Sequence, residues 1–322
     1  MAKLVAAIAL MASQLVLGTV MAPAQGAYPS RPVRVICGFP AGTSADIMAR
    51  IYAQKLSEKY GQQFVVENRL GASGNLAAES VARADADGYT LLLGTVANSI
   101  SASALKSISH DFGADFAPIA VVSSATNILV VSEGTGVTSV TDFMKLAKER
   151  NDLLFGSAGV GTAPHLSGEL FNMMTGAKLT HVPYRGNSQG LVDLVSGRLH
   201  AIFAPAPTLA AFMQDQRVKA LAVTSSKRSS GHPTLPTLDE SGLPGFDTAI
   251  WYGFLAPKGT SPQILKLLAD GLVEAGTNAD VKMQLTRNGA EELSITLEKF
   301  GAFIAEDIKK WRAVVEFAQI KN

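Results

Sequence analysis

Apolar and polar residues follow one another along this chain in a pattern of strand, glycine-rich turn and helix. The first instance has a β-branched run at Val33–Ile36, a glycine break at Phe39–Gly42, and then apolar residues at helical spacing as far as Leu56. Thr43 is placed to cap this helix through its hydroxyl, and Asp46 three residues later completes a capping-box pattern. The turn is therefore expected to present backbone N–H groups at the positive end of a helix, where an anion is stabilised without a cationic side chain.

The same pattern returns in the second half of the chain. A strand at Leu153–Phe155 leads into the glycine-rich turn Gly156–Thr162, and an amphipathic helix follows that stops at Gly176. Two such turns, face to face across a cleft, could hold the two ends of a small dianion. An ordinary connection between a strand and a helix is the alternative interpretation of each turn.

Other segments extend an α/β pattern. Strands are predicted at 64–67, 89–93, 179–182, 199–203 and 218–223, and two β-rich runs fall within 118–132, where the chain leaves a first domain. Thr95 and Asn98 lie in a small polar turn after the apolar strand 89–93, at the edge where open parallel sheets bind ligands. The stretch 225–245 is rich in Ser, Gly and Pro and is predicted to be a long loop. A strand at 250–255 then returns to the first domain. Three helices, from Ser261 on, at 281–288 and at 296–317, finish the chain.

The amino terminus reads as a secretory signal peptide. Lys3 precedes an apolar run at Leu4–Met21, and small residues after it offer cleavage near Ala24 or Ala27. A membrane-anchoring helix is the competing interpretation, but polar residues dilute the run and no basic cluster follows it. The only cysteine of the chain, Cys37, cannot form an internal disulfide and is expected to be a buried thiol. We therefore expect an exported protein.

Charge and composition exclude several kinds of function. Removal of the leader leaves 27 basic and 27 acidic residues, so the mature chain has no excess positive charge to attract nucleic acid. No cluster of histidine, cysteine and carboxylate residues has the spacing of metal ligands, and no cofactor is indicated. The length that remains exceeds what one core usually organises, which favours two domains.

Two enzyme interpretations of the second turn compete with binding. The segment Gly156–Gly161 does not have the spacing of a dinucleotide fingerprint. Ser157 and His165 could form a hydrolase pair, but the sequence contains no G-x-S-x-G elbow and no evident acid to orient the histidine. His165 is more simply a residue that packs its helix or anchors the turn, and Arg185 more simply a solvated or structural arginine than a ligand contact.

The sequence resembles a known family, the exported solute receptors of tripartite tricarboxylate transporters, also called the Bug (Bordetella uptake gene) family. The similarity extends over essentially the whole mature chain. The motifs that carry it are YPSRPV at 28–33, FPAG at 39–42 with Asp46, VENR at 66–69, DGYTL at 87–91, GT at 161–162 with His165-Leu166, HVPYRG at 181–186, GLPG at 242–245 and KW at 310–311. Thr43, Leu70 and His200 depart from residues common in the family, which leaves the substrate open.

The resemblance implies a type II periplasmic-binding-protein fold, with two Rossmann-like α/β domains joined by two crossover segments. The expected division is a signal peptide at 1–27, a first domain at 28–128 plus 251–322, and a second domain at 129–250. The implied protein is a periplasmic receptor, not an enzyme. It would capture a small organic carboxylate (a di- or tricarboxylate, an aromatic acid or an acidic amino acid) and deliver it to a membrane permease.

The ligand-binding residues that we expect come from the turns of both domains. They are Phe39, Ala41, Gly42, Thr43, Ser44, Asp46, Thr95, Asn98, Ser157, Gly161, Thr162, His165 and Tyr184. We expect a monomer without bound metal or nucleic acid. A secreted hydrolase that uses Ser157 and His165, and an orphan receptor that feeds a signalling system, remain as alternatives.

Overall fold

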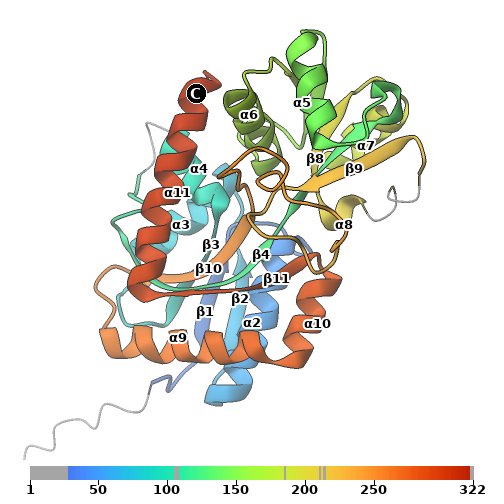
Figure 1. The fold of residues 1–322 in the computed structure, drawn as a ribbon. Coiled ribbons are helices and arrows are strands. Elements are labelled where there is room, and N and C mark those ends of the chain that lie inside the picture. Colours follow the sequence, from blue (N-terminus) through green and yellow to red (C-terminus); the bar gives the residue numbers. More distant parts are fainter. Residues whose placement is uncertain (1–27, 105–108, 185, 210–211, 213–214, 320–322) are drawn as a thin grey trace, which may run out of the picture. The chain divides into compact units, whose positions relative to one another are not determined.

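Two β-sheets organise the chain (Figure 1). The first sheet contains β1 (Val33–Cys37), β2 (Phe64–Asn68), β3 (Thr90–Thr95), β4 (Phe116–Ala125), β10 (Ile250–Pro257) and β11 (Ala290–Thr296). The second contains β5 (Asn127–Ser132), β6 (Leu154–Ser157), β7 (Thr180–Pro183), β8 (Ala201–Pro205) and β9 (Val218–Val223). Their strand orders are β11-β4-β10-β3-β1-β2 and β7-β6-β8-β5-β9.

The structure is a computed structural model that describes residues 28–104, 109–184, 186–209, 212 and 215–319. The predicted leader at 1–27 and Arg185 lie outside the described residues. From Arg31 onward the chain forms one compact unit.

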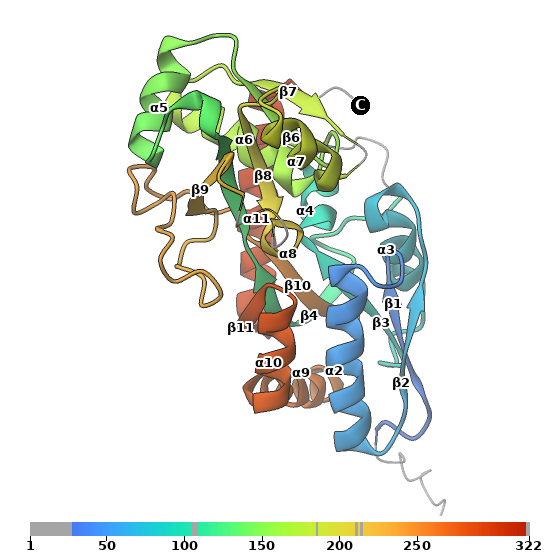
Figure 2. The ribbon, with the colours of Figure 1, turned by 90° about the vertical axis from the view of Figure 1, so that its right-hand side faces the viewer.

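Helices cover both faces of the first sheet. On one face α2 (Ser44–Tyr60), α9 (Pro262–Thr277) and α10 (Ala279–Arg287) pack against one another (Figure 2). The other face carries α3 (Asn75–Ala82), α4 (Val96–Ala104) and α11 (Leu297–Phe317). The second sheet is accompanied by α5 (Val140–Glu149), α6 (Ala163–Thr175), α7 (Asn187–Val195) and the short α8 (Ala206–Leu209), and two 3₁₀ turns lie at Ala72–Gly74 and Glu133–Thr135. The predicted α/β pattern is confirmed.

Two predictions along the chain are wrong. No strand was predicted between the last helices, yet β11 extends the first sheet by pairing antiparallel with β4. Two glutamates follow its first residue, Ala290, and an edge strand with charged side chains lacks the apolar alternation that marks a strand. The polar turn expected at Thr95–Asn98 is the start of a helix, because α4 follows β3 without a gap.

The strand directions fix where the turns of interest lie. Strands β1, β2 and β3 are parallel, and β4 runs the same way because β3 and β4 are both antiparallel to β10. Only Thr126 separates the end of β4 from the start of β5 in the second sheet. Strands β6, β7 and β8 run opposite to β5, so they end where β5 begins, and Asn127 pairs with Pro205 there. The carboxyl edges of both sheets therefore lie at the crossing at Thr126.

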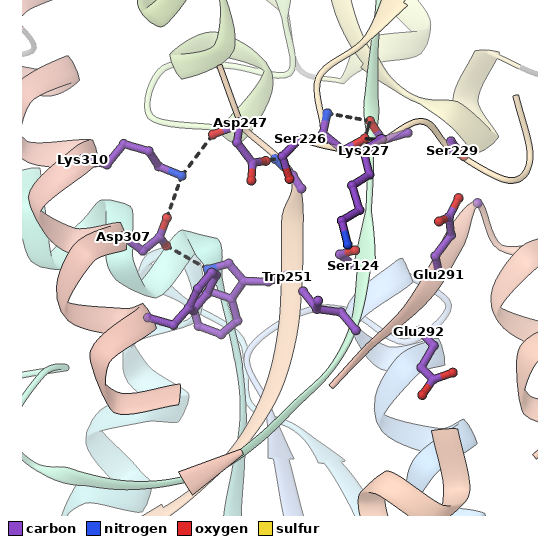
Figure 3. Close-up of a pocket in the computed structure, with 16 residues that line it drawn as sticks. Ser124, Ser226, Lys227, Ser229, Asp247, Trp251, Glu291, Glu292, Asp307 and Lys310 are labelled. Atoms are coloured by element: carbon purple, nitrogen blue, oxygen red, sulfur yellow. Dashed lines mark hydrogen bonds and ion pairs between the residues drawn. The ribbon is translucent and has the colours of Figure 1, made fainter. Parts of the chain in front are cut away.

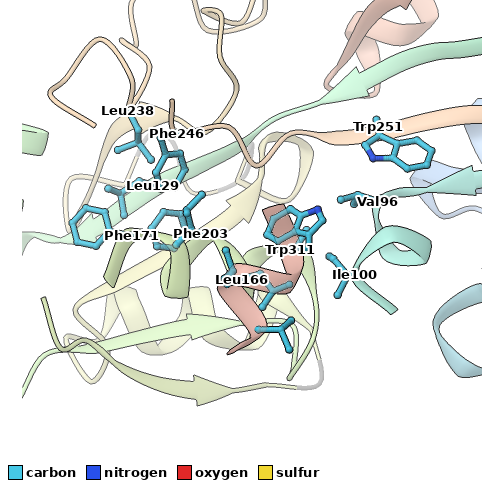
Figure 4. Packing of buried hydrophobic residues seen from close by; sticks show 14 of the residues in the cluster. Val96, Ile100, Leu129, Leu166, Phe171, Phe203, Leu238, Phe246, Trp251 and Trp311 are labelled. Atoms are coloured by element: carbon cyan, nitrogen blue, oxygen red, sulfur yellow. The ribbon is translucent and has the colours of Figure 1, made fainter. Parts of the chain in front are cut away.

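A continuous apolar cluster includes side chains from both sheets and their helices. Trp311 of α11 lies beside Leu166 of α6, and Val96 and Ile100 of α4 are close by (Figure 4). Trp311 is fully buried. Helix α11, which follows a strand of the first sheet, thus also packs against a helix of the second.

Candidate functional site

The turn between β1 and α2 is built around Gly42, which has a φ of +80°. Its N–H donates to Asp46 Oδ2 at 2.9 Å, and the Thr43 hydroxyl donates back to the Pro40 carbonyl at 2.7 Å. The predicted capping box is therefore wrong: Thr43 occupies the N-cap position but makes no side-chain cap, and Asp46 accepts from Gly42 instead. The glycine is needed because its positive φ directs the N–H back towards the helix.

Asp46 is buried and has several partners. Arg50 Nε donates to both of its oxygens at 3.0 Å, and Asn68 Nδ2 donates at 2.8 Å. Burial opposes ionisation, but the hydrogen bonds from Arg50, Gly42 and Asn68 outweigh it and lower the pKa of Asp46 to about 2. Asp46 is thus an ionised structural anchor, with its oxygens already occupied by the protein.

The first turn of α2 keeps donors that the protein does not use. Within the described residues, no hydrogen bond involves the N–H groups of Ser44, Ala45 and Asp46. These N–H groups lie at the positive end of a helix of 17 residues. Helix-end N–H groups of this kind are the donors predicted to face an anion, although they come two to four residues after Gly42.

A second unused donor lies at the same edge of the first sheet. Asn98 is 2% exposed; its Oδ1 accepts the Thr95 N–H at 3.0 Å, and its Nδ2 has no partner among the described residues. A Cβ added to Gly74 would lie 3.7 Å from this Nδ2 and 3.4 Å from the Phe39 ring. Phe39, Gly74 and Asn98 therefore meet. A buried amide without a partner requires an explanation, and a ligand or water that accepts from it is one.

The turn between β6 and α6 repeats the first turn in detail. Gly161 has a φ of +76°, its N–H donates to His165 Nδ1 at 3.1 Å, and the Thr162 hydroxyl donates to the Gly159 carbonyl at 2.7 Å. Each turn thus has a glycine with positive φ, then a threonine bonded three residues back, and an acceptor side chain four residues after the glycine. The second helix start differs in its donors, because Pro164 has no N–H and His165 N–H faces the Thr162 hydroxyl at 3.5 Å.

The alternative interpretation, a hydrolase pair of Ser157 and His165, is not supported, because the two side chains bond other partners. The Ser157 side chain shares a hydrogen bond of 2.7 Å with His181 Nε2, and His165 is occupied by Gly161. Burial lowers the pKa of His181 to about 4, and burial together with His181 lowers that of His165 to about 3, so both rings are neutral near pH 7. Ser157 is fully buried. His165 anchors the turn through Gly161, which is the simpler of the two roles given for it from the sequence.

Tyr184 follows directly after β7 and bonds the end of β6. Its hydroxyl donates to Asp193 Oδ2 at 2.9 Å and its N–H to the Ser157 carbonyl at 3.1 Å. Burial, followed by Asp193, raises the pKa of Tyr184 to about 12. The predicted residues therefore gather in two groups, one on each carboxyl edge, with Ala41 exposed on the first turn.

A separate cavity of about 210 Å³ lies by the second crossing, where the chain returns to the first sheet at Ile250. It is bounded by β11, α11 and the segment 224–249 (Figure 3). None of the predicted site residues lines it. Its charged groups are largely paired, since Asp307 accepts from Trp251 Nε1 at 2.8 Å and Lys310 Nζ at 2.9 Å. Lys310 also donates to the Asp247 carbonyl at 3.1 Å, which fastens α11 to the crossing segment.

Some functional positions were not among the predicted site residues. Arg50 could have been found, because it lies four residues after Asp46 on the same helix face. His181 is 24 residues from Ser157, and Asn68 is 22 from Asp46, so only tertiary structure brings these pairs together. In the described residues no three His, Cys, Asp or Glu side chains gather where a metal could bind, and no helix is both long and apolar enough to cross a membrane.

The chain is similar to several known proteins. Residues 48–320 match the family described as "Tripartite tricarboxylate transporter family receptor". The chain is 34% identical to Protein BugT of Bordetella pertussis over 291 residues, 89% of each chain. It is similar to the structure "R. palustris Rpa4515 with adipate" at 35% identity and a TM-score of 0.74, covering 91% of this chain and 99% of that one. The structure of MatC from Rhodopseudomonas palustris with bound malate matches at 29% identity and a TM-score of 0.71, covering 89% and 100%.

The fold and these similarities identify a solute-binding receptor with the type II arrangement of two α/β domains, as predicted. The chain belongs to the tripartite tricarboxylate transporter receptor (TctC, or Bug) family. Proteins of this family are periplasmic receptors, and its structural neighbours are receptors too, not enzymes.

Proposed function

We propose that this protein is exported to the periplasm, captures a small organic carboxylate between the carboxyl edges of its two sheets, and delivers it to the permease of a tripartite tricarboxylate transporter. The observation that carries the proposal is the pair of matching turns, one at Gly42 and one at Gly161, on the edges that share the crossing at Thr126. The relatives described with adipate and with malate support a carboxylate as the ligand.

Unused donors at the first turn support anion capture. The N–H groups of Ser44, Ala45 and Asp46, with Asn98 Nδ2, offer up to four hydrogen bonds. A hydrogen bond to a charged group contributes about 1.5–3 kcal/mol. Four of them would contribute about 6–12 kcal/mol, a range that includes the roughly 8 kcal/mol of micromolar affinity, and any surplus would offset the immobilisation of the ligand.

The charges at the site favour a ligand without an amino group. Asp46 is occupied by Arg50, Asn68 and Gly42, so it is not available to an ammonium group. The sequence places no other acid in the turns 39–45, 69–75, 95–99 or 157–164. A di- or tricarboxylate or an aromatic acid is therefore favoured over an acidic amino acid.

The sheets also support the expected domains. The strands change sheet at Thr126 and return with Ile250, which favours a first domain at 28–128 plus 251–322 and a second at 129–250. Cleavage near Ala24 or Ala27 and a monomeric state are part of the proposal. If the chain binds its ligand but supports no uptake, an orphan receptor that feeds a signalling system is the alternative.

A thermal-shift screen tests the proposal. A ligand that binds only the folded chain raises its apparent stability, by about 2.7 kcal/mol at a concentration one hundred times the dissociation constant. We expect adipate, malate or another carboxylate to raise the melting temperature, with aspartate and glutamate weaker, and glucose and ATP without effect. Asn98→Ala should reduce the shift. A screen in which no carboxylate stabilises the protein would refute the proposal.

A further inference from the structure

We propose that His165 and His181 are positioning residues that hold the second turn in its ligand-binding shape, and that His165 does so only while its Nδ1 carries no proton. The inference rests on the proposed function for the place where the ligand binds. It assigns to His165 a role other than ligand contact, and it adds His181, which is far from the turn in sequence.

The hydrogen bond from Gly161 determines the tautomer of His165. Because the Gly161 N–H donates to Nδ1 at 3.1 Å, Nδ1 is an acceptor and the ring proton resides on Nε2. Nε2 faces Glu169 Oε1 at 3.6 Å. A protonated imidazole has no acceptor, so protonation would leave the Gly161 N–H without its partner and release the turn.

The first turn uses an acceptor that does not change in this way. Gly42 donates to Asp46, which holds its partners through two oxygens and stays ionised, with a pKa of about 2. The two turns therefore share a shape but differ in chemistry. A single proton removes the acceptor at His165, because a protonated imidazole has none, whereas a carboxyl group such as that of Asp46 keeps acceptor capacity when it is protonated.

The surroundings keep His165 neutral and in place. The His181 ring lies 3.9 Å from the His165 ring, centroid to centroid, and is itself held by Ser157 at 2.7 Å. His181 on β7 and Glu169 on α6 are the titratable groups described as facing His165. Phe155 on β6 stacks on the His165 ring and lies tilted against the His181 ring, and Phe203 on β8 packs edge to face against Phe155. Burial and the neighbouring ring both disfavour a charge here.

Nuclear magnetic resonance of the ligand-free protein tests the inference directly. We expect ¹⁵N shifts that identify Nε2 as protonated and Nδ1 as an acceptor at pH 7, and a Gly161 amide signal that moves only as His165 titrates, well below pH 6.5. An Nδ1-protonated ring, or a Gly161 amide that is indifferent to the titration, would overturn the proposal whatever the protein binds.

Variants test the same point through binding, with adipate as the probe and isothermal titration calorimetry at pH 7. His165→Asn keeps an acceptor near the position of Nδ1 and should bind within about threefold of the wild type. His165→Leu removes the acceptor and should bind about tenfold more weakly, the equivalent of one lost hydrogen bond. Equal affinities of these two folded variants would contradict the inference.

His200→Leu is the matched control. His200 Nδ1 also accepts a backbone N–H, from Leu154 at 3.0 Å, but at the start of β6, away from the turn. This variant should bind adipate like the wild type, and circular dichroism should show that each variant folds. If the wild type binds no carboxylate, the proposed function fails while the resonance measurement still decides the role of His165.

Discussion

At the scale of single residues, the site depends on close backbone approach. A Cβ placed on Gly38 would lie 2.4 Å from the Gly74 Cα, a contact between two main chains that no side-chain rotation can relieve. Gly38 follows β1 and Gly74 precedes α3, so this contact brings the turns after β1 and β2 together. The small residues here are required by packing as well as by turn geometry.

Gly38→Ala should therefore destabilise the protein by about 1–3 kcal/mol or more, the usual cost of overpacking. Gly134→Ala is the control, because its Cβ would meet only the Ser132 Oγ at 3.8 Å. Urea unfolding followed by circular dichroism measures both. Equal unfolding free energies for the two variants would show that the contact of Gly38 with Gly74 relaxes without cost.

At the scale of elements, α11 is attached to the second crossing by a buried carboxylate. Asp307 is 4% exposed and accepts from Trp251 and Lys310, and Lys310 continues to the Asp247 carbonyl. Glu306, one residue earlier, pairs with Lys309 where both side chains are largely exposed. The same helix thus offers a buried and an exposed ion pair side by side.

Asp307→Ala should reduce the unfolding free energy by about 2–4 kcal/mol, because it leaves the buried Trp251 N–H without its acceptor and a half-buried Lys310 without its counter-ion. Glu306→Ala should change it by less than about 0.5 kcal/mol, since exposed pairs contribute little. Chemical denaturation of both variants measures these changes. Similar losses of unfolding free energy in the two variants would contradict the prediction.

Elements with a strong pattern could be predicted from the sequence, and contacts between distant elements could not. The buried strand 90–95, the helix that ends at Gly61 and the strand 218–223 were found because apolar periodicity and a stop residue coincide there. The edge strand β11 was missed because its polar residues hide the period of two. Both turns were located, but their glycine N–H groups were expected to be open to ligand, and each is occupied by a side chain four residues on.

At the scale of the whole molecule, stability depends on buried groups that resist protonation. The unfolded chain takes protons on its histidines near pH 6.5, whereas His165 and His181 in the folded state do so at about 3 and 4. The folded state therefore binds fewer protons below pH 6.5, and acid favours unfolding. Asp46 adds to this below its unfolded pKa of 3.8, because its folded pKa is about 2.

The unfolding free energy should accordingly fall as pH decreases from 6.5 towards 4, with a slope of up to about 1.4 kcal/mol per pH unit for each of the two histidines. The double variant His165→Asn/His181→Asn should show a shallower slope over the same range. Urea titrations at half-unit pH steps measure it. Parallel slopes for the variant and the wild type would show that these rings do not set the acid sensitivity.

The unequal starts of α2 and α6 have a consequence for any molecule held between them. Helix α2 offers three N–H groups without partners among the described residues. Helix α6 offers fewer, because Pro164 has no N–H and the Thr162 hydroxyl accepts from the His165 N–H. A symmetric dicarboxylate such as adipate would then bind asymmetrically, because its two carboxylates would meet different sets of hydrogen-bond donors. The two carboxylates of bound adipate would therefore contribute unequally to its affinity.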